Sequence, residues 1–124
     1  MDKKKILIVD DDATVTRTLK LYLDETGSYD IRTLNEGSRA LEVARAFQPD
    51  LVLLDLIMPD TDGATIAGDL KEDPQLKDVP IVFLTALVSA KEVGAQGRDI
   101  GGYPFLAKPV DPDKVVEAIE KYTQ

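Results

Sequence analysis

Residues 50–59 read DLVLLDLIMP, and this stretch indicates a buried strand that ends in a charged residue. The four apolar residues 51–54 are typical of a strand that is buried on both faces, as in a parallel sheet. Asp55 ends the run, and apolar residues resume immediately at Leu56. Because a carboxylate is seldom buried without a partner, we expect Asp55 to lie at the mouth of the core and to face a polar site.

Similar runs occur elsewhere along the chain. Residues 6–9 and 81–84 are continuously apolar, which indicates further central strands. Residues 29–34 alternate apolar and polar side chains, as a half-exposed edge strand does. The weaker run at 103–107 contains Pro104, which cannot donate to a ladder hydrogen bond, so we expect this strand at the other edge.

Helical patterns separate these strands. Residues 15–23, 40–47 and 115–122 place their apolar side chains on one helical face. Strand and helix alternate along the chain, which predicts a parallel sheet with helices on both faces. We therefore expect a single α/β domain over residues 1–124.

Composition excludes several function classes. The 124 residues carry a formal net charge of −8 without a long basic run, which argues against direct binding of nucleic acid. The chain contains no Cys and no His, so thiol chemistry, Ser-His triads and most zinc sites are excluded. The apolar stretch after MDKKK is too short for a signal peptide or a membrane span. We expect a cytoplasmic protein that does not insert into membranes.

Polar side chains follow four of the five predicted strands. Asp10 and Asp11 follow the first strand, Asp55 the third, Thr85 the fourth and Lys108 the fifth. Because the carboxyl ends of parallel strands meet at one edge, where open α/β sheets bind ligands, these residues should share a site.

Each of these residues also has an ordinary structural interpretation. Asp12 suits a helix N-cap, Asp10 and Asp11 suit the start of a helix, Thr85 suits a turn, and Lys108 suits a solvated surface. Their joint arrangement favours a functional site, because converging carboxylates repel each other unless a cation neutralises them. Mg²⁺, or Mn²⁺, fits a cluster of two or three carboxylates with waters and a phosphate.

Four motifs resemble the response-regulator receiver domain of two-component signalling, and the resemblance covers essentially the whole chain. The motifs are ILIVDDD (6–12), LVLLDLIMPDTDG (51–63), IVFLTA (81–86) and FLAKP (105–109). The family implies a five-stranded parallel sheet in the flavodoxin-like order 2-1-3-4-5. Since no effector domain follows the last predicted helix, we expect a stand-alone receiver similar to chemotaxis regulators.

The resemblance implies how the acidic residues would act. Asp55 would become an acyl phosphate, with a phosphohistidine on a sensor histidine kinase or on a histidine phosphotransfer protein as the donor. Asp10, Asp11, Asp55 and the backbone carbonyl of Ile57 would bind the metal ion. Any such histidine must belong to the partner, because this chain has none.

The resemblance also implies roles for the other strand-end residues. Thr85 and Lys108 would contact the phosphoryl oxygens and, with Asp55, carry the transfer. Thr85 and Phe105 would form the switch that reports phosphorylation. The peptide bond between Lys108 and Pro109 is expected to be cis, which proline permits at low cost.

Two further features concern output and the lifetime of the phosphoryl group. Ala86 would leave room for the donor, whereas the apolar Ile57 and Leu87 would crowd an attacking water and predict slow hydrolysis. The resemblance implies an output surface that controls binding of a downstream protein and is also a candidate homodimer interface. This surface comprises residues 88–98, 103–107 and 111–122.

Two alternatives remain open. A Mg²⁺-dependent phosphatase that works through an aspartyl phosphate would also place aspartates at strand ends, but the chain lacks a cap domain and an evident substrate pocket. A phosphorylation-independent scaffold would not need every side chain of the site, yet all of them are present. We expect a signalling receiver that assists only its own phosphorylation and dephosphorylation, and not an enzyme acting on other substrates.

Overall fold

A five-stranded parallel sheet lies at the centre of the computed structural model, which describes residues 3–86 and 102–123. Neighbouring strands are all parallel, in the order β2-β1-β3-β4-β5. This confirms the predicted α/β class and strand order, with β2 and β5 at the edges. The strands are β1 (Lys4–Val9), β2 (Tyr29–Leu34), β3 (Leu51–Asp55), β4 (Ile81–Thr85) and β5 (Phe105–Ala107).

The fifth strand is shorter than the predicted run at 103–107. It begins at Phe105, directly after Pro104, because a proline nitrogen carries no hydrogen for the ladder. The Pro104 carbonyl still accepts a hydrogen bond from the Phe83 N–H at 2.9 Å. The peptide bond between Lys108 and Pro109 is cis, as predicted.

Helices α1, α2 and α3 and one short 3-10 helix, η1, lie between the first four strands, and α4 follows β5. No helix within the described ranges combines the length and the apolar character that crossing a membrane requires. Residues 88–98 of the predicted output surface lie outside the described residues, and the helical pattern at 115–122 lies within α4. The helices are α1 (Ala13–Thr26), η1 (Gly37–Arg39), α2 (Ala40–Phe47), α3 (Gly63–Glu72) and α4 (Pro112–Tyr122).

Capping residues explain where the longer helices begin and end. Asp12, Asp62 and Asp111 each precede a helix and accept a hydrogen bond from a backbone N–H of its first turn. Gly27 ends α1 in the left-handed region with φ 73°, a conformation that glycine adopts without strain. Asp12 is therefore the N-cap that its position predicts.

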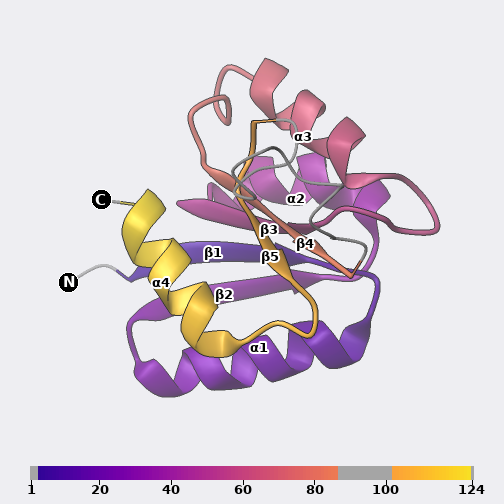
Figure 1. The fold of residues 1–124 in the computed structure, drawn as a ribbon. Coiled ribbons are helices and arrows are strands. Elements are labelled where there is room, and N and C mark those ends of the chain that lie inside the picture. Colours follow the sequence, from indigo (N-terminus) through magenta and orange to yellow (C-terminus); the bar gives the residue numbers. More distant parts are fainter. Residues whose placement is uncertain (1–2, 87–101, 124) are drawn as a thin grey trace.

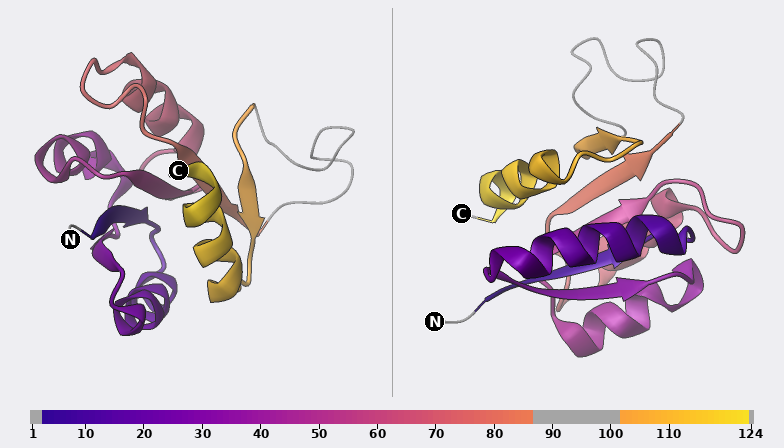
Figure 2. Two further views of the ribbon diagram at one scale, coloured as in Figure 1. Left: turned by 90° about the vertical axis from the view of Figure 1, so that its left-hand side faces the viewer. Right: turned by 90° about the horizontal axis from the view of Figure 1, so that it is seen from below.

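Helices cover both faces of the sheet, so the strand side chains divide between two apolar cores (Figure 1). Leu7 and Val9 of β1 pack with the residues of α2 and α3, whereas Ile6 and Ile8 pack with those of α1 and α4. Figure 2 shows α4 beside β5 at one side of the sheet. All residues of β3 are buried, so polar side chains can gather only where the strands end.

Candidate functional site

The sheet brings the predicted site residues together at its carboxyl end. The register of β1 and β3 places Asp10 next to Asp55, and Asp11 follows directly. On the other side of β3, the Lys108 N–H donates to the carbonyl of Thr85 at 2.8 Å. The ends of four strands, β1, β3, β4 and β5, thus bring acidic residues, a hydroxyl and an ammonium to one edge of the sheet.

Asp10, Asp11 and Asp55 converge closely enough to bind one cation. One carboxylate oxygen from each lies within 4.8 Å of the others. Asp10 is completely buried and Asp55 is 4% exposed, whereas Asp11 is exposed. Lys108 Nζ lies 2.8 Å from Asp10 Oδ2 and 3.5 Å from Asp55 Oδ1. One ammonium therefore pairs with two of the three carboxyl groups, which leaves an excess of negative charge when all three are ionised.

The Asp10 carboxylate is only partly satisfied by the protein. Its Oδ1 accepts a hydrogen bond from the Asp12 N–H at 2.9 Å. Among the described residues, no donor makes a well-aligned hydrogen bond to its buried Oδ2, and the Lys108 ammonium at 2.8 Å contributes an ion pair instead. Buried polar atoms in proteins are nearly always hydrogen-bonded, so this oxygen points to a ligand in the cluster.

Burial and neighbouring acids raise the pKa of Asp55 to about 7. Burial is the largest cause, followed by hydrogen bonding to Asp11 and repulsion from Asp10, while Lys108 and the Ile57 N–H act in the opposite direction. Burial would lower the pKa of Lys108, but its contacts with Asp10 and Asp55 outweigh burial and raise it. In the metal-free site, Lys108 is charged and Asp55 is partly protonated near neutral pH.

This donor set fits a hard divalent cation. Mg²⁺ prefers oxygen ligands and retains several waters, so it needs only a few carboxylates from a protein. The cluster offers three carboxylates, and the buried Asp10 Oδ2 among them is compensated by the ion pair with Lys108. A bound cation would also offset the repulsion that raises the pKa of Asp55.

The loop between β3 and α3 holds Ile57 close to the cluster. The Gly63 N–H donates to the Leu56 carbonyl at 2.7 Å, and Ile57 forms an antiparallel bridge with Asp62. The Ile57 N–H lies 3.4 Å from Asp55 Oδ1, and its side chain is 54% exposed. Gly63 permits this close approach, because a Cβ there would collide with the Asp55 carbonyl oxygen.

The other predicted residues lie on the neighbouring strands. Thr85 is 2% exposed at the end of β4, and Ala86 is exposed directly after it. Phe105 is partly buried and packs against the core that includes α2 and α3. Leu87 lies outside the described residues, so its place near the phosphoryl group stays a prediction.

Asn35 was not predicted as a site residue from the sequence, yet it supports the acidic loop, residues 10–12 between β1 and α1. Its side-chain amide donates to the carbonyl of Asp10 at 2.7 Å and to the hydroxyl of Thr16 at 3.1 Å. The Asp10 N–H donates in turn to the Leu34 carbonyl at 3.0 Å. The end of β2 therefore holds the loop that carries two of the three carboxylates. A polar residue directly after the predicted strand 29–34 is the signal that could have indicated this role.

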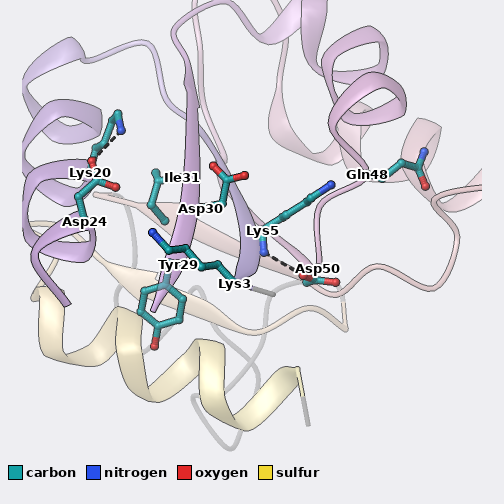
Figure 3. Close-up of a pocket in the computed structure, with 9 residues that line it drawn as sticks. All are labelled: Lys3, Lys5, Lys20, Asp24, Tyr29, Asp30, Ile31, Gln48 and Asp50. Atoms are coloured by element: carbon teal, nitrogen blue, oxygen red, sulfur yellow. Dashed lines mark hydrogen bonds and ion pairs between the residues drawn. The ribbon is translucent and has the colours of Figure 1, made fainter. Parts of the chain in front are cut away.

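A hollow of about 860 Å³ lies at the opposite, amino end of the strands (Figure 3). Lys20 pairs with Asp24 at 2.7 Å, and Asp50 accepts a hydrogen bond from the Lys5 N–H at 2.8 Å. Lys3 and Asp30 complete three lysines and three aspartates in the lining. Because these charges offset one another, this end lacks the concentration of like charge found in the carboxylate cluster.

Comparison with known proteins identifies the family. The model of the response regulator receiver domain matches residues 6–120. The chain is 34% identical over 115 residues to the DNA-binding dual master transcriptional regulator RpaA of Synechocystis sp., covering 93% of this chain and 47% of that protein. It is 35% identical over 120 residues to the response regulator PleD of Caulobacter vibrioides, covering 97% and 26%. The chain thus spans about half or less of the length of these relatives.

Solved structures agree with the sequence relatives. The chemotaxis protein CheY4 of Vibrio cholerae superposes with a TM-score of 0.82 at 26% identity, covering 98% of this chain and 99% of that one. The N-terminal domain of a response regulator receiver protein from Methanoculleus marisnigri JR1 gives a TM-score of 0.71 at 34% identity, covering 94% of both chains. On the fold, the strand-end motifs and the match over residues 6–120, the chain belongs to the response regulator receiver domains of two-component systems.

Proposed function

We propose that this chain is a signalling switch that accepts a phosphoryl group on Asp55 and then alters its binding to a downstream protein. Mg²⁺, or Mn²⁺, would be bound by Asp10, Asp11, Asp55 and the backbone carbonyl of Ile57. The observation that carries the proposal is the cluster of three carboxylates, two of which pair with the Lys108 ammonium. Membership of the receiver family supports it, because phosphorylation on an aspartate is a general property of that family.

The transfer would use a carboxylate as the nucleophile. A bond would form between an Asp55 oxygen and phosphorus, while the bond from phosphorus to the donor's leaving group breaks and the leaving group keeps its electron pair. When bound, Mg²⁺ supplies positive charge that favours ionised Asp55 and neutralises the phosphoryl oxygens. Lys108 would pair with one phosphoryl oxygen, and the hydroxyl of Thr85 would donate to another.

The donor would be a phosphohistidine on a sensor histidine kinase or on a histidine phosphotransfer protein. A cavity of about 180 Å³ beside Lys108, between α1 and the loop before α4, supports docking of such a partner near Asp55. Its lining includes Val15, Pro109 and Val110, so it offers apolar contact next to the charged site. We propose a cytoplasmic location for the chain and its donor.

Output would pass from Thr85 through Phe105 to the surface that includes β5 and α4. A groove of about 320 Å³ lies between β5 and α4, and Phe105, Leu106, Lys114 and Lys121 are among its lining residues. A downstream protein would bind there, and the same surface is a candidate homodimer interface. The predicted contribution of residues 88–98 lies outside the described part of the chain.

Phosphorylation by acetyl phosphate, followed by intact mass, tests the proposal. The wild type should gain one phosphoryl group in Mg²⁺ and none in EDTA, and Asp55→Asn should gain none. Asp69→Asn, which changes an exposed aspartate of α3, is the matched control and should behave like the wild type. Equal incorporation into Asp55→Asn would refute Asp55 as the acceptor.

The same wild-type and variant proteins distinguish this proposal from the two alternatives, a phosphatase and a phosphorylation-independent scaffold. Release of phosphate from small phosphoesters over many turnovers would favour the aspartyl-phosphate phosphatase. Partner binding that is unchanged by phosphorylation and by Asp55→Asn would favour the scaffold.

A further inference from the structure

Residues 35–38, which lie between β2 and α2, contact both loops that carry the proposed metal ligands. Asn35 Nδ2 donates to the carbonyl of Asp10 at 2.7 Å, in the loop between β1 and α1. The Ser38 N–H donates to Asp60 Oδ2 at 2.9 Å, in the loop between β3 and α3. One short turn therefore links two loops that are far apart in the sequence.

The first contact fixes the backbone of the acidic loop. The Asp10 N–H is bonded to the Leu34 carbonyl at 3.0 Å, so Asn35 completes the pairing of both backbone polar groups of Asp10. Asp10 Oδ1 accepts the Asp12 N–H at 2.9 Å. The chain is thus held on both sides of Asp11, whose own side chain is exposed.

The second contact is reinforced by close packing. Gly37 is buried, and a Cβ there would lie 2.8 Å from Met58 Cε and 2.8 Å from Thr61 Cγ2. These two residues stand on either side of Asp60 in the sequence, so packing and hydrogen bond act on the same short segment. Ile57, whose carbonyl is the proposed backbone ligand, directly precedes Met58.

We infer that Asn35 and Asp60 are positioning residues for the metal site, Asn35 by holding the Asp10–Asp11 loop and Asp60 by tying the loop of Ile57 to the same turn. The inference rests on the proposed function, because it concerns the affinity of that site for Mg²⁺. Residues that orient metal ligands commonly contribute about 10- to 100-fold to metal affinity. Neither side chain belongs to the two apolar cores, so the metal-free fold should tolerate their loss.

Calorimetric titration of the metal-free protein with Mg²⁺ tests the role of Asn35. Thr16 accepts the second hydrogen bond of Asn35 at 3.1 Å, so Thr16→Val removes that bond and leaves the one to Asp10. Asn35→Ala should raise the Kd for Mg²⁺ about 10-fold or more, whereas Thr16→Val should change it by less than about twofold. Circular dichroism melts without metal establish that both variants are folded.

A second pair of variants tests Asp60 independently. Asp60→Asn and Asp60→Ala both remove the charge, but only asparagine keeps an oxygen that can accept the Ser38 N–H. Asp60→Ala should therefore bind Mg²⁺ several-fold more weakly than Asp60→Asn does. Their ratio measures the hydrogen bond apart from the electrostatic effect.

The outcomes distinguish this inference from the proposed function. A wild type that binds no Mg²⁺ would overturn both. If the wild type binds Mg²⁺ but Asn35→Ala matches Thr16→Val, or the two Asp60 variants match each other, the positioning role of that residue is wrong and the metal site stands. A metal-free Asn35→Ala that does not fold would also overturn the role for Asn35, because that residue would then support the fold.

Discussion

At the residue scale, Asp55 has to meet two requirements that conflict. It ends a strand that is buried on both faces, yet it must be ionised to attack phosphorus. Lys108 favours the ionised form, but its ammonium lies closer to Asp10, at 2.8 Å, than to Asp55, at 3.5 Å. Its charge is therefore shared, and burial with Asp11 and Asp10 still raises the pKa of Asp55 to about 7.

This raised pKa predicts how stability without metal depends on pH. The pKa of Asp55 is about 7 in the folded protein against an ordinary 3.8, so the native state keeps a proton that the unfolded state releases between these values. The contribution of Asp55 to the free energy of unfolding should therefore fall across this window, by at most about 1.4 kcal/mol per pH unit. Asp55→Asn does not titrate, so its stability advantage over the wild type should grow from about pH 4 to pH 7.

Urea unfolding at a series of pH values in EDTA measures that difference. Comparing wild type with Asp55→Asn cancels the carboxylates that do not interact with Asp55, because those titrate alike in both proteins. Saturating Mg²⁺ should reduce the pH dependence, because the cation favours the ionised carboxylate. A difference that stays constant over the whole pH range would contradict the raised pKa.

Ile57 predicts a slow loss of the phosphoryl group. Its side chain is 54% exposed beside Asp55, and it can neither orient nor hydrogen-bond an attacking water. Ile57→Asn, alone or with Leu87→Glu, should shorten the phosphoryl half-life, and a tenfold change requires only about 1.4 kcal/mol off the barrier. Ile57→Val keeps the apolar character and should decay like the wild type. The half-life is measured in Mg²⁺ after the donor is removed, and equal decay of all variants would contradict the prediction.

At the element scale, the strands could be predicted because central strands of a parallel sheet leave uninterrupted apolar runs. The run at 51–54 lies within β3 and the run at 81–84 within β4, each with one polar residue at its end. The strand predicted at 103–107 is too long: β5 begins only at Phe105, because Pro104 has no N–H to donate to a neighbouring strand. The 3-10 helix η1 could not be predicted, because three residues carry no periodic signal.

The candidate site was predictable to the same extent as the topology. Strand order alone brings Asp10, Asp55 and Lys108 to one edge, and their ion pairs follow from that placement. The hydrogen bonds of Asn35 and Asp60 could not be predicted, because they depend on how loops pack against each other. The chemical roles assigned to these residues stay predictions until phosphorylation is measured.

Helix α3 contains two glycines in different surroundings, Gly63 against the end of β3 and Gly68 in open space, and they predict opposite effects of substitution. At Gly63, a Cβ would collide with the Asp55 carbonyl and lie 2.9 Å from Leu56 Cα. Gly63→Ala should therefore destabilise the protein by about 1–3 kcal/mol and weaken Mg²⁺ binding. At Gly68 nothing lies within 4 Å, so Gly68→Ala should stabilise by about 0.5–1 kcal/mol. Urea unfolding of both variants checks this, and equal effects would contradict it.

At the scale of the whole molecule, a polar contact as well as an apolar core connects the two helices on each face of the sheet, α1 with α4 and α2 with α3. The Tyr22 hydroxyl of α1 donates to Asp113 of α4. On the other face, Arg45 of α2 pairs with the buried Asp73 that follows α3, and this contact lowers the pKa of Asp73. These contacts connect the helices without involving the carboxylate cluster, where Lys108 offsets only part of the negative charge.

The whole fold should therefore be more stable with Mg²⁺ than without it. Asp10, Asp11 and Asp55, of which only Asp11 is exposed, converge in a chain of net charge −8, and a cation site that exists only in the native state favours folding. Mg²⁺ at about 100 times its dissociation constant should add roughly 2.7 kcal/mol, enough to raise the Tm by several degrees. Asp55→Asn should melt higher than the wild type in EDTA and gain less from Mg²⁺, because it has lost both the repulsion and a ligand.

The melts in Mg²⁺ are compared with melts in NaCl at matched ionic strength, since screening alone also weakens repulsion. A wild-type Tm that responds equally to both salts would mean that the native protein holds no specific cation at this edge of the sheet.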